Sequence, residues 1–519
     1  MKNAVISNVA EELRGIFKRF ANRTLMIDRY SGREYSYAEF QSISLKGAVY
    51  LKKLQLCKGD TIVVICENCF ELPLLFVAAW TVGVKVVPIN ADLSAAQITD
   101  IIASADPKAC FVSQNAFASL DTIHDLFQTL STIVFSPEYM EADEKSSVSL
   151  TSIWHEHQES LDLFEYLEDD FSFLRIYTSG STAAPKGIDV SASRLIGNEQ
   201  LFCKAMKIDK DNRFYNLLPM SYLGGVHNLF LLPMSVGGSF VIDQPLGPSN
   251  VFGFWDYVKN FDINTLWFSP TMLTMLMALR DEDDILEITQ KIKLALVGMA
   301  PLSQTTKSEF EQRFQFELRE NFALSETTFI TSQLPGVMYD ENCKGDVLAG
   351  VQIEIIDPNG QSLDEKQEGE VFVNTPFLMK GYINAKQTDL DAITPTGFKT
   401  GDLGYLDGGK LYIVGRAKDL IIRGGLNISP ALVESEVAKL PYIQAASVVG
   451  IENKYYGEEV AAAIILRQGQ NVTVEQIEDD LGKILPVFQV PKSILLVSEF
   501  PQGLTGKIDK KQIRKMFDT

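Results

Sequence analysis

The chain has 519 residues, of which 46% are hydrophobic and 22% are charged, and its formal net charge is −20. This length exceeds what one hydrophobic core supports, so two or more domains are expected, and the composition excludes extensive disorder. The charge excludes non-specific binding to nucleic acid or anionic membranes, because the global field repels both, although a local basic patch can still bind an anionic cofactor.

The chain carries no recognisable signal for export or membrane insertion. No cationic segment with an apolar core stands near Met1, and the most apolar stretches, Leu72–Val84 and Leu229–Ile242, are too short to span a bilayer. The six cysteines are scattered, and Cys66-Glu-Asn-Cys69 has no second pair, which favours structural cysteines over a zinc or redox site. We therefore expect a cytosolic protein with reduced thiols.

The N-terminal part of the sequence alternates between helical and strand patterns. Apolar spacing predicts a helix near Val5–Phe20, and Tyr35-Ser-Tyr-Ala-Glu-Phe40 opens another. The β-branched run Thr61–Cys66, the apolar stretch Leu72–Trp80 and the segment Gly83–Asn90 then read as strand, helix and strand. This order predicts a βαβ unit in a parallel sheet that is buried on both faces.

A loop rich in hydroxyl residues follows the apolar run Phe173–Tyr177. Its sequence is Tyr177-Thr-Ser-Gly-Ser-Thr-Ala-Ala-Pro-Lys-Gly187, which places Thr178, Ser179, Gly180, Ser181, Thr182 and Lys186 together. Such a loop can present backbone N–H groups and hydroxyl donors to a polyphosphate, whereas the alternative is an ordinary flexible surface loop. The spacing matches neither a P-loop nor a dinucleotide-binding turn.

This loop closely resembles the Thr-Ser-Gly-Ser/Thr-Thr-Gly-x-Pro-Lys-Gly signature of the adenylate-forming superfamily. The superfamily includes acyl-CoA and aryl-CoA synthetases, stand-alone adenylation domains and firefly-type luciferases. One residue departs from the signature, Ala183 in place of glycine. The resemblance implies a large N-terminal α/β domain with parallel and mixed sheets, a small mobile α+β cap, and ATP as a substrate.

Further along, one segment resembles the wall of the family's acyl pocket. Leu217-Leu-Pro-Met-Ser-Tyr-Leu-Gly-Gly225 leads into a predicted helix that carries His227. The family commonly has Leu-Pro-x-Phe-His here, with the histidine gating the pocket, and Tyr222 takes the place of that histidine. His227 is a second candidate for the pocket lining, unless it is an ordinary helix histidine.

Two further segments are similar to the family's adenine-binding elements. Leu294-Ala-Leu-Val-Gly-Met-Ala-Pro301 reads as a strand that ends in a tight turn, which implies an adenine wall at Ala300 and Pro301 and a pocket position at Gly298. Glu320-Asn-Phe-Ala-Leu-Ser-Glu-Thr-Thr328 resembles the Tyr-Gly-x-Thr-Glu element. The roles that this resemblance implies are stacking on adenine for Phe322, acceptance from its amino group for Glu320 beside Asn321, an α-phosphate contact for Ser325, and Mg²⁺ ligation for Glu326 with Thr178.

The next matching element is similar to the family's ribose clamp and hinge. Asp402 lies in Thr400-Gly-Asp-Leu-Gly404, and a carboxylate makes charge-assisted hydrogen bonds to vicinal hydroxyls. The resemblance gives Arg416 a second ribose contact and places the hinge at Lys418. We therefore predict an ATP- and carboxylate-binding domain over residues 1–417 and a cap over residues 418–519.

The sequence after Lys418 predicts smaller units that suit a compact α+β cap. The expected elements are a strand at Leu420–Arg423, a helix at Ala431–Leu440, strands near Ala446–Ile451 and Val460–Leu466, and a helix near Val474–Leu485. By resemblance, Gly424 and Gly425 face the thiol channel. The final segment Pro501-Gln-Gly-Leu-Thr-Gly-Lys507-Ile-Asp resembles the one that carries the family's catalytic lysine.

Together these elements predict an ATP-dependent, AMP-forming acid–thiol ligase with Lys507, Glu326 and Lys186 as catalytic residues and Mg²⁺ as cofactor. Members of the superfamily that activate amino acids carry an aspartate at the place of Tyr222–Gly225, where this chain has no acidic residue. The resemblance therefore implies a carboxylic acid without an α-amino group, aryl or medium acyl, because a buried ammonium group would lack a partner. Coenzyme A is the leading acceptor, and a phosphopantetheinyl carrier protein and an amine are the alternatives. A non-catalytic adenylate-binding protein is a further alternative, because Ala183, Tyr222, Ala323 and Leu432 depart from the family pattern.

Overall fold

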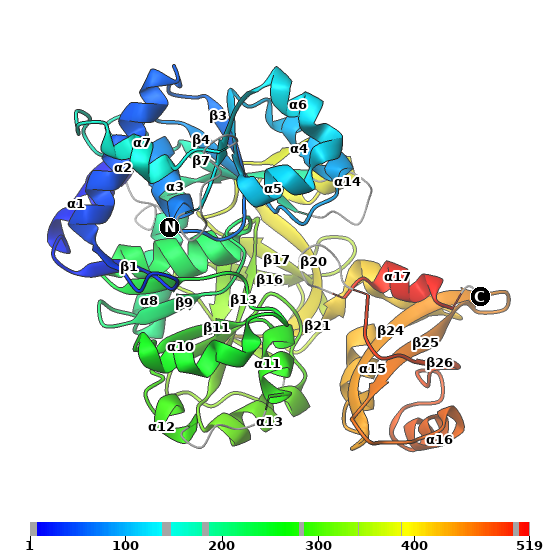
Figure 1. Cartoon of the computed structure of the whole chain (residues 1–519). Coiled ribbons are helices and arrows are strands. Elements are labelled where there is room, and N and C mark those ends of the chain that lie inside the picture. Colours follow the sequence, from blue (N-terminus) through cyan, green and yellow to red (C-terminus); the bar gives the residue numbers. More distant parts are fainter. Residues whose placement is uncertain are drawn as a thin grey trace.

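The computed structural model describes residues 8–137, 147–178, 186–279, 285–340, 342–385, 387–501 and 508–517. Within these ranges the strands form three sheets of 14, 7 and 5 strands. The two larger sheets belong to a large N-terminal part, and the third lies in a small C-terminal part at the lower right of Figure 1. The expected fold class is thus present. No helix in the described ranges combines the length and the hydropathy that crossing a bilayer requires.

The seven-stranded sheet contains the predicted βαβ unit. Strands β3 and β4 pair in parallel, with Ile65 opposite Ile89, and the intervening helix α3 (Glu71–Thr81) is buried along its whole length. Burial on all sides explains why this stretch is apolar without an amphipathic pattern. The strand order is β18-β8-β7-β4-β3-β5-β6. The bounds are β3 (Thr61–Ile65), β4 (Lys85–Ile89), β5 (Ala109–Ser113), β6 (Ser131–Phe135), β7 (Ser172–Thr178), β8 (Lys186–Ser191) and β18 (Tyr382–Ile383).

The 14-stranded sheet is parallel in one half and antiparallel in the other. From β1 through β10, β9, β11 and β12 to β13 the neighbours are parallel, and from β13 through β14, β15, β21, β20 and β17 to β16 they are antiparallel. Strand β2 pairs β1, and β19 pairs β20. The bounds are β1 (Thr24–Asp28), β2 (Glu34–Ser36), β9 (Arg213–Asn216), β10 (Ser239–Ile242), β11 (Thr265–Phe268), β12 (Leu294–Val297), β13 (Leu318–Leu324), β14 (Thr328–Ser332), β15 (Cys343–Val347), β16 (Gln352–Ile356), β17 (Gly369–Asn374), β19 (Ile393–Thr394), β20 (Gly397–Asp407) and β21 (Lys410–Arg416).

Helices pack on both larger sheets (Figure 1). The first predicted helix is α1 (Val9–Arg19), capped by Asn8, and the second is α2 (Tyr37–Lys53), which begins with a capping box between Ser36 and Glu39. The remaining helices of this part are α4 (Ala95–Ala105), α5 (Gln114–Ser119), η1 (Asp121–Ile123), α6 (His124–Thr129), α7 (Leu150–His155), α8 (Ala192–Met206), η2 (Gly224–Leu231), α9 (Leu232–Val236), η3 (Val251–Gly253), α10 (Phe254–Asn260), α11 (Pro270–Met277), α12 (Ile285–Thr289), α13 (Gln304–Phe314) and α14 (Gln387–Leu390).

The C-terminal part has hydrophobic cores of its own. In the described ranges, the core of the large part includes no buried residue after Leu411, and the cores of the small part include none before Ile421. The short 3₁₀ helix η4 (Ala417–Asp419) connects the two parts. The elements of the small part are β22 (Ile421–Arg423), β23 (Leu426–Ile428), α15 (Pro430–Val437), β24 (Ile443–Asn453), β25 (Gly457–Leu466), α16 (Val474–Ile484), β26 (Ser493–Leu496) and α17 (Lys510–Lys515).

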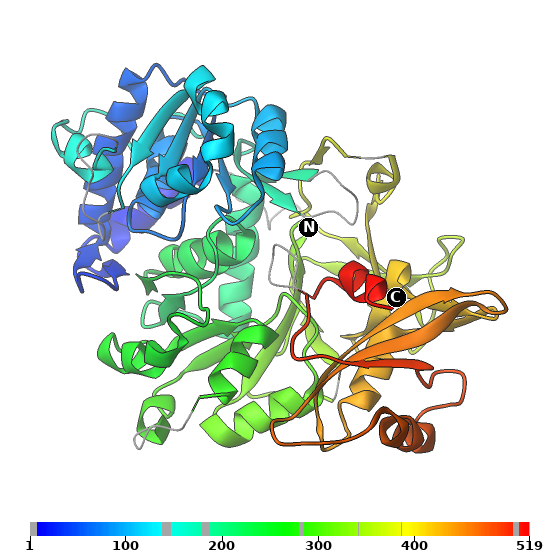
Figure 2. The same ribbon diagram turned by 45° about the vertical axis from the view of Figure 1, so that its right-hand side comes forward.

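A few polar contacts join the cap to the body. Arg467 forms an ion pair with Glu309 on α13 at 2.7 Å, and Thr305 of the same helix donates a hydrogen bond to Ala438 O at 3.4 Å. Figure 2 shows the cap beside the strands that end the large sheet. Such partly exposed contacts contribute little free energy, so they hold the cap weakly.

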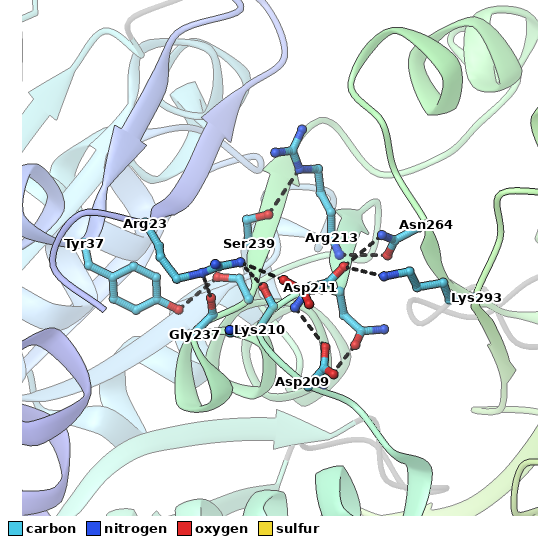
Figure 3. Close-up of polar contacts among 12 residues, drawn as sticks. Arg23, Tyr37, Asp209, Lys210, Asp211, Arg213, Gly237, Ser239, Asn264 and Lys293 are labelled. Carbon is cyan, nitrogen blue, oxygen red and sulfur yellow. Dashed lines mark hydrogen bonds and ion pairs between the residues drawn. The ribbon is translucent and has the colours of Figure 1, made fainter. Parts of the chain in front are cut away.

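The amino ends of the parallel strands are tied together by a polar network (Figure 3). Arg213 donates from its guanidinium to Phe261 O at 2.8 Å, and its backbone N–H donates to Asn264 Oδ1 at 2.9 Å. Asp211 O accepts from Asn264 at 2.9 Å and from Lys293 at 3.2 Å. The carboxyl ends of the same strands lie at the opposite edge of the sheet, where ligands of α/β sheets usually bind.

Candidate active site

The predicted phosphate loop joins the antiparallel strands β7 and β8. Thr178 pairs with Lys186 across the ends of these strands. Asp189 fixes the hairpin, because its carboxylate accepts hydrogen bonds from Arg175 at 2.6 Å and from Lys85 at 2.7 Å. The residues predicted to contact phosphate, Ser179, Gly180, Ser181 and Thr182, lie outside the described residues together with Ala183.

Lys186 is placed by two residues, Tyr382 of β18 and Asp389 of α14. Its ammonium nitrogen lies 2.9 Å from Asp389 Oδ1 and 4.2 Å from the centre of the Tyr382 ring. Tyr382 reaches this position because β18 pairs with β8, with Ile383 opposite Gly187. A carboxylate and an aromatic face both attract an ammonium group, so the lysine is oriented before any ligand binds.

Glu326 is oriented by the same tyrosine. It lies with Ser325 in the turn between β13 and β14, and the Tyr382 hydroxyl donates to Glu326 Oε1 at 2.7 Å. The Glu326 backbone oxygen accepts from Met379 N–H at 2.7 Å. Burial, followed by the charge of Glu326, raises the pKa of Tyr382 far above its usual value, so the phenol remains a hydrogen-bond donor. Tyr382 thus joins two of the predicted catalytic residues.

Replacement of Tyr382 with phenylalanine is expected to lower the rate of adenylate formation by about fivefold and to raise the Mg²⁺ concentration needed for half-maximal rate. One hydrogen bond contributes about 1 kcal/mol, and its loss frees the Glu326 carboxylate to rotate. The measurement is pyrophosphate exchange at varied Mg²⁺. Tyr405→Phe is the matched control, since Tyr405 stacks on Tyr412 away from Glu326. An unchanged Mg²⁺ dependence in Tyr382→Phe would contradict the assignment.

The predicted adenine wall is built by the parallel strands β12 and β13. Val297 lies opposite Glu320, so Gly298 and Asn321 follow side by side. A Cβ at Gly298 would lie 2.4 Å from Asn321 Oδ1, which leaves no room for a side chain. Ala300 and Phe322 are half-buried and Pro301 is exposed beside this contact. Met299, between Gly298 and Ala300, has a φ of 71°, a backbone conformation that non-glycine residues rarely adopt.

Glu320 and Asn321 differ in their hydrogen-bond partners. The Glu320 carboxylate contacts the ammonium groups of Lys344 and, at 3.6 Å, of Lys307. Asn321 Oδ1 is buried and has no hydrogen-bond partner among the described residues. A buried acceptor without a partner is costly, so this atom suits a ligand that brings an N–H donor, such as the amino group of adenine.

Substitution of Gly298 with alanine is expected to weaken ATP binding by about tenfold while the fold is retained. The added methyl group must displace the Asn321 side chain and with it the acceptor proposed for adenine, and overpacking of this kind costs about 1 to 3 kcal/mol. Calorimetric titration with ATP, without acid, measures the effect. Gly482→Ala serves as control, because nothing lies within 4 Å of its added Cβ. Equal ATP affinity in Gly298→Ala and the unmodified protein would contradict the assignment.

The predicted ribose clamp is a cross-strand ion pair. Asp402 on β20 lies opposite Arg416 on β21, and Arg416 Nε donates to Asp402 Oδ1 at 2.7 Å. Asp402 is 4% exposed, whereas the Arg416 side chain is 42% exposed. Burial, and then the neighbouring charge of Arg416, lowers the pKa of Lys418, and Lys186 lowers it further. Arg416 and Lys418 therefore both lie near Asp402 in a strongly acidic chain, which suits an anionic nucleotide.

The two predicted pocket residues occupy different environments. Tyr222 is half-buried at the end of the loop before η2, a π-helix. His227 on η2 is 2% exposed, with Nε2 3.4 Å from Glu199 Oε1 and its ring stacked on Phe329 at 4.7 Å. Burial lowers the pKa of His227 to about 3, so its imidazole is neutral at neutral pH, and burial also raises the pKa of Glu199 well above its usual value. The structure therefore places His227 in the core rather than on an exposed pocket surface.

The cap supplies the last predicted residues. Gly424 and Gly425 form the turn between β22 and β23 with φ values of 58° and 84°, which favour glycine. The Gly424 N–H donates to Tyr456 O at 2.8 Å. Lys507 lies outside the described residues, although Asp509 N–H donates to Pro501 O at 2.8 Å across the segment that contains it.

Sequence reasoning missed Tyr382 and Asp389 as contacts of the predicted catalytic residues. Both follow Gly381 in a segment without a phosphate-binding or metal-binding pattern. Only the pairing of the two-residue strand β18 with β8 brings them to Lys186. A strand this short has no periodicity that a sequence pattern can reveal.

Solved structures resemble this fold over nearly the whole chain. ATP-bound MatB from Rhodopseudomonas palustris matches with a TM-score of 0.86 at 24% identity, covering 97% of this chain and 98% of that chain. The amide bond synthetase McbA from Marinactinospora thermotolerans matches with a TM-score of 0.85 at 21% identity, covering 98% and 100%. These matches confirm the predicted fold class.

Curated relatives of the chain include CoA ligases for different acids. Oxalate–CoA ligase of Arabidopsis thaliana is 27% identical over 475 residues, 88% of either chain. Indoleacetate–CoA ligase of Aromatoleum aromaticum is 23% identical over 491 residues, 94% of either chain. These relatives support the expected AMP-forming acid–thiol ligase, and their differing acids leave the substrate of this chain open.

Family models match both parts of the chain. The model described as AMP-binding enzyme matches residues 14–383, and that described as AMP-binding enzyme C-terminal domain matches residues 432–507. The predicted hinge at Lys418 lies between these two segments, and its exact position stays a prediction. The chain therefore belongs to the family of AMP-binding enzymes, the adenylate-forming superfamily that its motifs resemble.

Proposed function

We propose that this enzyme activates an aryl or medium acyl carboxylic acid, without an α-amino group, as its acyl-AMP and transfers the acyl group to the thiol of coenzyme A. The observation that carries the proposal is the shared contact of Tyr382 with Lys186 and Glu326. This contact brings Lys186 and Glu326 close to the same side chain, although the strands that carry or flank them belong to different sheets.

The first half-reaction joins two anions. A carboxylate oxygen attacks the α-phosphorus of ATP, and the bond from that phosphorus to pyrophosphate breaks. Lys186 would bind the leaving pyrophosphate, and Lys507 would bridge the substrate carboxylate and the α-phosphate. Positive charge placed where negative charge develops is the main source of rate enhancement in such a step. In the second half-reaction a thiol attacks the acyl carbonyl, and AMP leaves.

The residues present suit the nucleotide and the metal ion. Asn321 Oδ1 offers a buried acceptor to adenine, and Asp402 with Arg416 offers charged partners to the ribose hydroxyls. Glu326 has a carboxylate of the kind that Mg²⁺ prefers, with one oxygen already held by Tyr382. Bound there, Mg²⁺ would neutralise charge on the phosphates. Thr178 remains a proposed second ligand.

The proposed substrate class rests on the lining near Tyr222. The segment Tyr222–Gly225 contains no acidic residue, so an α-ammonium group buried there would lack a partner, which is costly. The half-buried ring of Tyr222 also offers an apolar face to the acid. We therefore favour an uncharged acyl or aryl substituent next to the carboxylate.

Coenzyme A is the proposed acceptor because the segment Ile421–Pro430 resembles the CoA-ligase version of this element. A carrier protein is the close alternative, because Leu432 replaces an acidic residue of the usual pattern. The likeness to the amide bond synthetase McbA makes an amine acceptor a further candidate. A non-catalytic protein is disfavoured, since Lys186, Glu326, Asp402, Arg416 and Lys507 are all present.

Pyrophosphate exchange with a panel of carboxylic acids tests the proposal. We expect exchange with one class of acids that lack an α-amino group, followed by CoA-dependent release of AMP without any carrier protein. Exchange with amino acids alone would overturn the substrate class, and AMP release that needs a carrier or an amine would overturn the acceptor. Absence of exchange with every acid would support the non-catalytic alternative.

A further inference from the structure

The loop Leu217–Tyr222, here called the pocket loop, packs tightly against the start of η2, which in turn lies near the predicted adenine wall. A Cβ at Gly225 would lie 2.5 Å from Pro219 O, so the start of η2 presses directly on this loop. A Cβ at Gly224 would lie 3.3 Å from Met299 Sδ, beside the predicted adenine wall. The position of the pocket loop therefore affects the space available between the acid and the nucleotide.

Asn68 fixes the base of the pocket loop. This residue is 3% exposed, and its Nδ2 donates to Leu218 O at 2.9 Å and to Asp243 O at 3.0 Å. Its Oδ1 accepts from Met220 N–H at 2.9 Å. The Asn68 amide therefore forms hydrogen bonds with two backbone groups of the pocket loop and one of the segment after β10. In the described ranges none of these three backbone groups has a hydrogen bond to another backbone group.

Asn90 holds the other end of the pocket loop. Its side chain hydrogen bonds to the hydroxyl of Tyr222, and its Oδ1 accepts from Asp92 N–H at 3.0 Å. The bond to Asp92 fixes the Asn90 side chain within its own turn and leaves its NH₂ group to donate to the Tyr222 hydroxyl. The ring of Tyr222 is held by a hydrogen bond at its hydroxyl end and by the chain at its Cα.

Both asparagines come from the same edge of the seven-stranded sheet. Strands β3 and β4 pair with Ile65 opposite Ile89, and Asn68 and Asn90 follow just after these residues. The pocket loop instead follows β9 of the 14-stranded sheet. Each asparagine thus links the seven-stranded sheet to a loop of the 14-stranded sheet.

We propose that Asn68 and Asn90 are positioning residues for the acid: Asn68 sets the backbone of the pocket loop, and Asn90 sets the ring of Tyr222. This inference rests on the proposed function, because it assumes that Tyr222 borders the acid. It implies a preformed pocket whose shape selects the acid, since a ring fixed at both ends does not adapt to each substrate.

A double-mutant cycle over Asn90 and Tyr222 tests the inference. In Asn90→Ser the serine keeps an acceptor for Asp92 N–H but is one bond shorter, and Tyr222→Phe removes only the hydroxyl. We expect each variant to raise the KM for the best acid by about fivefold, with the KM for ATP unchanged. The double variant should be no worse than the poorer single variant, because both remove the same hydrogen bond.

Asn68→Asp supplies an independent readout. It keeps the acceptor for Met220 N–H and loses the donors to Leu218 O and Asp243 O, so we expect a broader range of accepted acids at equal ATP affinity. If this buried variant fails to fold, the Asn90 and Tyr222 cycle decides alone. Additive effects in the cycle, or an equal rise in the KM for ATP, overturn the inference while exchange by the unmodified enzyme upholds the proposed function. Absence of exchange by the unmodified enzyme overturns both.

Discussion

Lys507→Ala is expected to lower the rate of adenylate formation by about 10²- to 10³-fold, which is the usual cost of removing one preorganised contact to developing charge. The reacting carboxylate and the α-phosphate repel each other, and the ammonium group of Lys507 would offset that repulsion in the transition state. ATP binding should persist, because the residues predicted to contact adenine, ribose and the outer phosphates belong to the large N-terminal part. Pyrophosphate exchange measures the rate, and calorimetric titration measures ATP binding.

The control for this experiment is Lys511→Ala. Lys511 is an exposed lysine at the start of α17, and its substitution changes the net charge equally. We expect this variant to keep the exchange rate of the unmodified enzyme. Undiminished exchange in Lys507→Ala would remove the lysine from the mechanism, and loss of ATP affinity would give it a binding role instead.

Lys418→Pro is expected to slow thioester formation by at least about tenfold while adenylate formation is retained. In the proposed cycle Lys507 and the incoming thiol would need the same face of the adenylate, so the cap would have to rotate between the two half-reactions. Proline fixes φ at this position and also restricts the residue before it, which opposes the rotation. Burst formation of acyl-AMP and the rate of CoA-dependent AMP release measure the two steps separately.

Lys418→Ala separates the charge of this residue from its backbone. Alanine removes the ammonium group beside Arg416 but leaves φ free, so both half-reactions should proceed at similar rates to the unmodified enzyme. If Lys418→Pro slows both half-reactions to the same extent, the position is not the hinge. If alanine reproduces the proline effect, the side chain rather than the backbone matters.

The sequence motifs predict which strands form the candidate site, but they do not predict which way the side chains on those strands point. The sequence of Glu320–Thr328 predicts contacts with the nucleotide, and in the structure this segment forms the end of β13 and the turn to β14. Successive side chains of a strand point to opposite faces, so Glu320 and Asn321 cannot both face the same slot. Pairing with β12 turns Asn321 toward Gly298, while Glu320 meets Lys344. Sequence alone does not specify that register.

The segment after the pocket loop has a second feature that the sequence does not predict. A helix carrying His227 was expected, and the structure has a π-helix over Gly224–Leu231. Gly225 lies against Pro219 O, a contact between the helix and the preceding loop that helix propensity does not describe. The βαβ unit around α3 was predictable because its burial is uniform, whereas His227 beside Glu199 depended on how α8 and η2 pack together.

The separate hydrophobic cores on the two sides of η4 have a thermodynamic consequence. Heat capacity changes in proteins follow the hydration of apolar surface. A cap that rotates as a rigid unit exposes no apolar surface from its own core or from the core of the large part. The heat-capacity change between the two orientations should therefore be close to zero. The enthalpy difference between the two orientations would then be nearly constant with temperature, and the ligands that each orientation admits would set the balance between them.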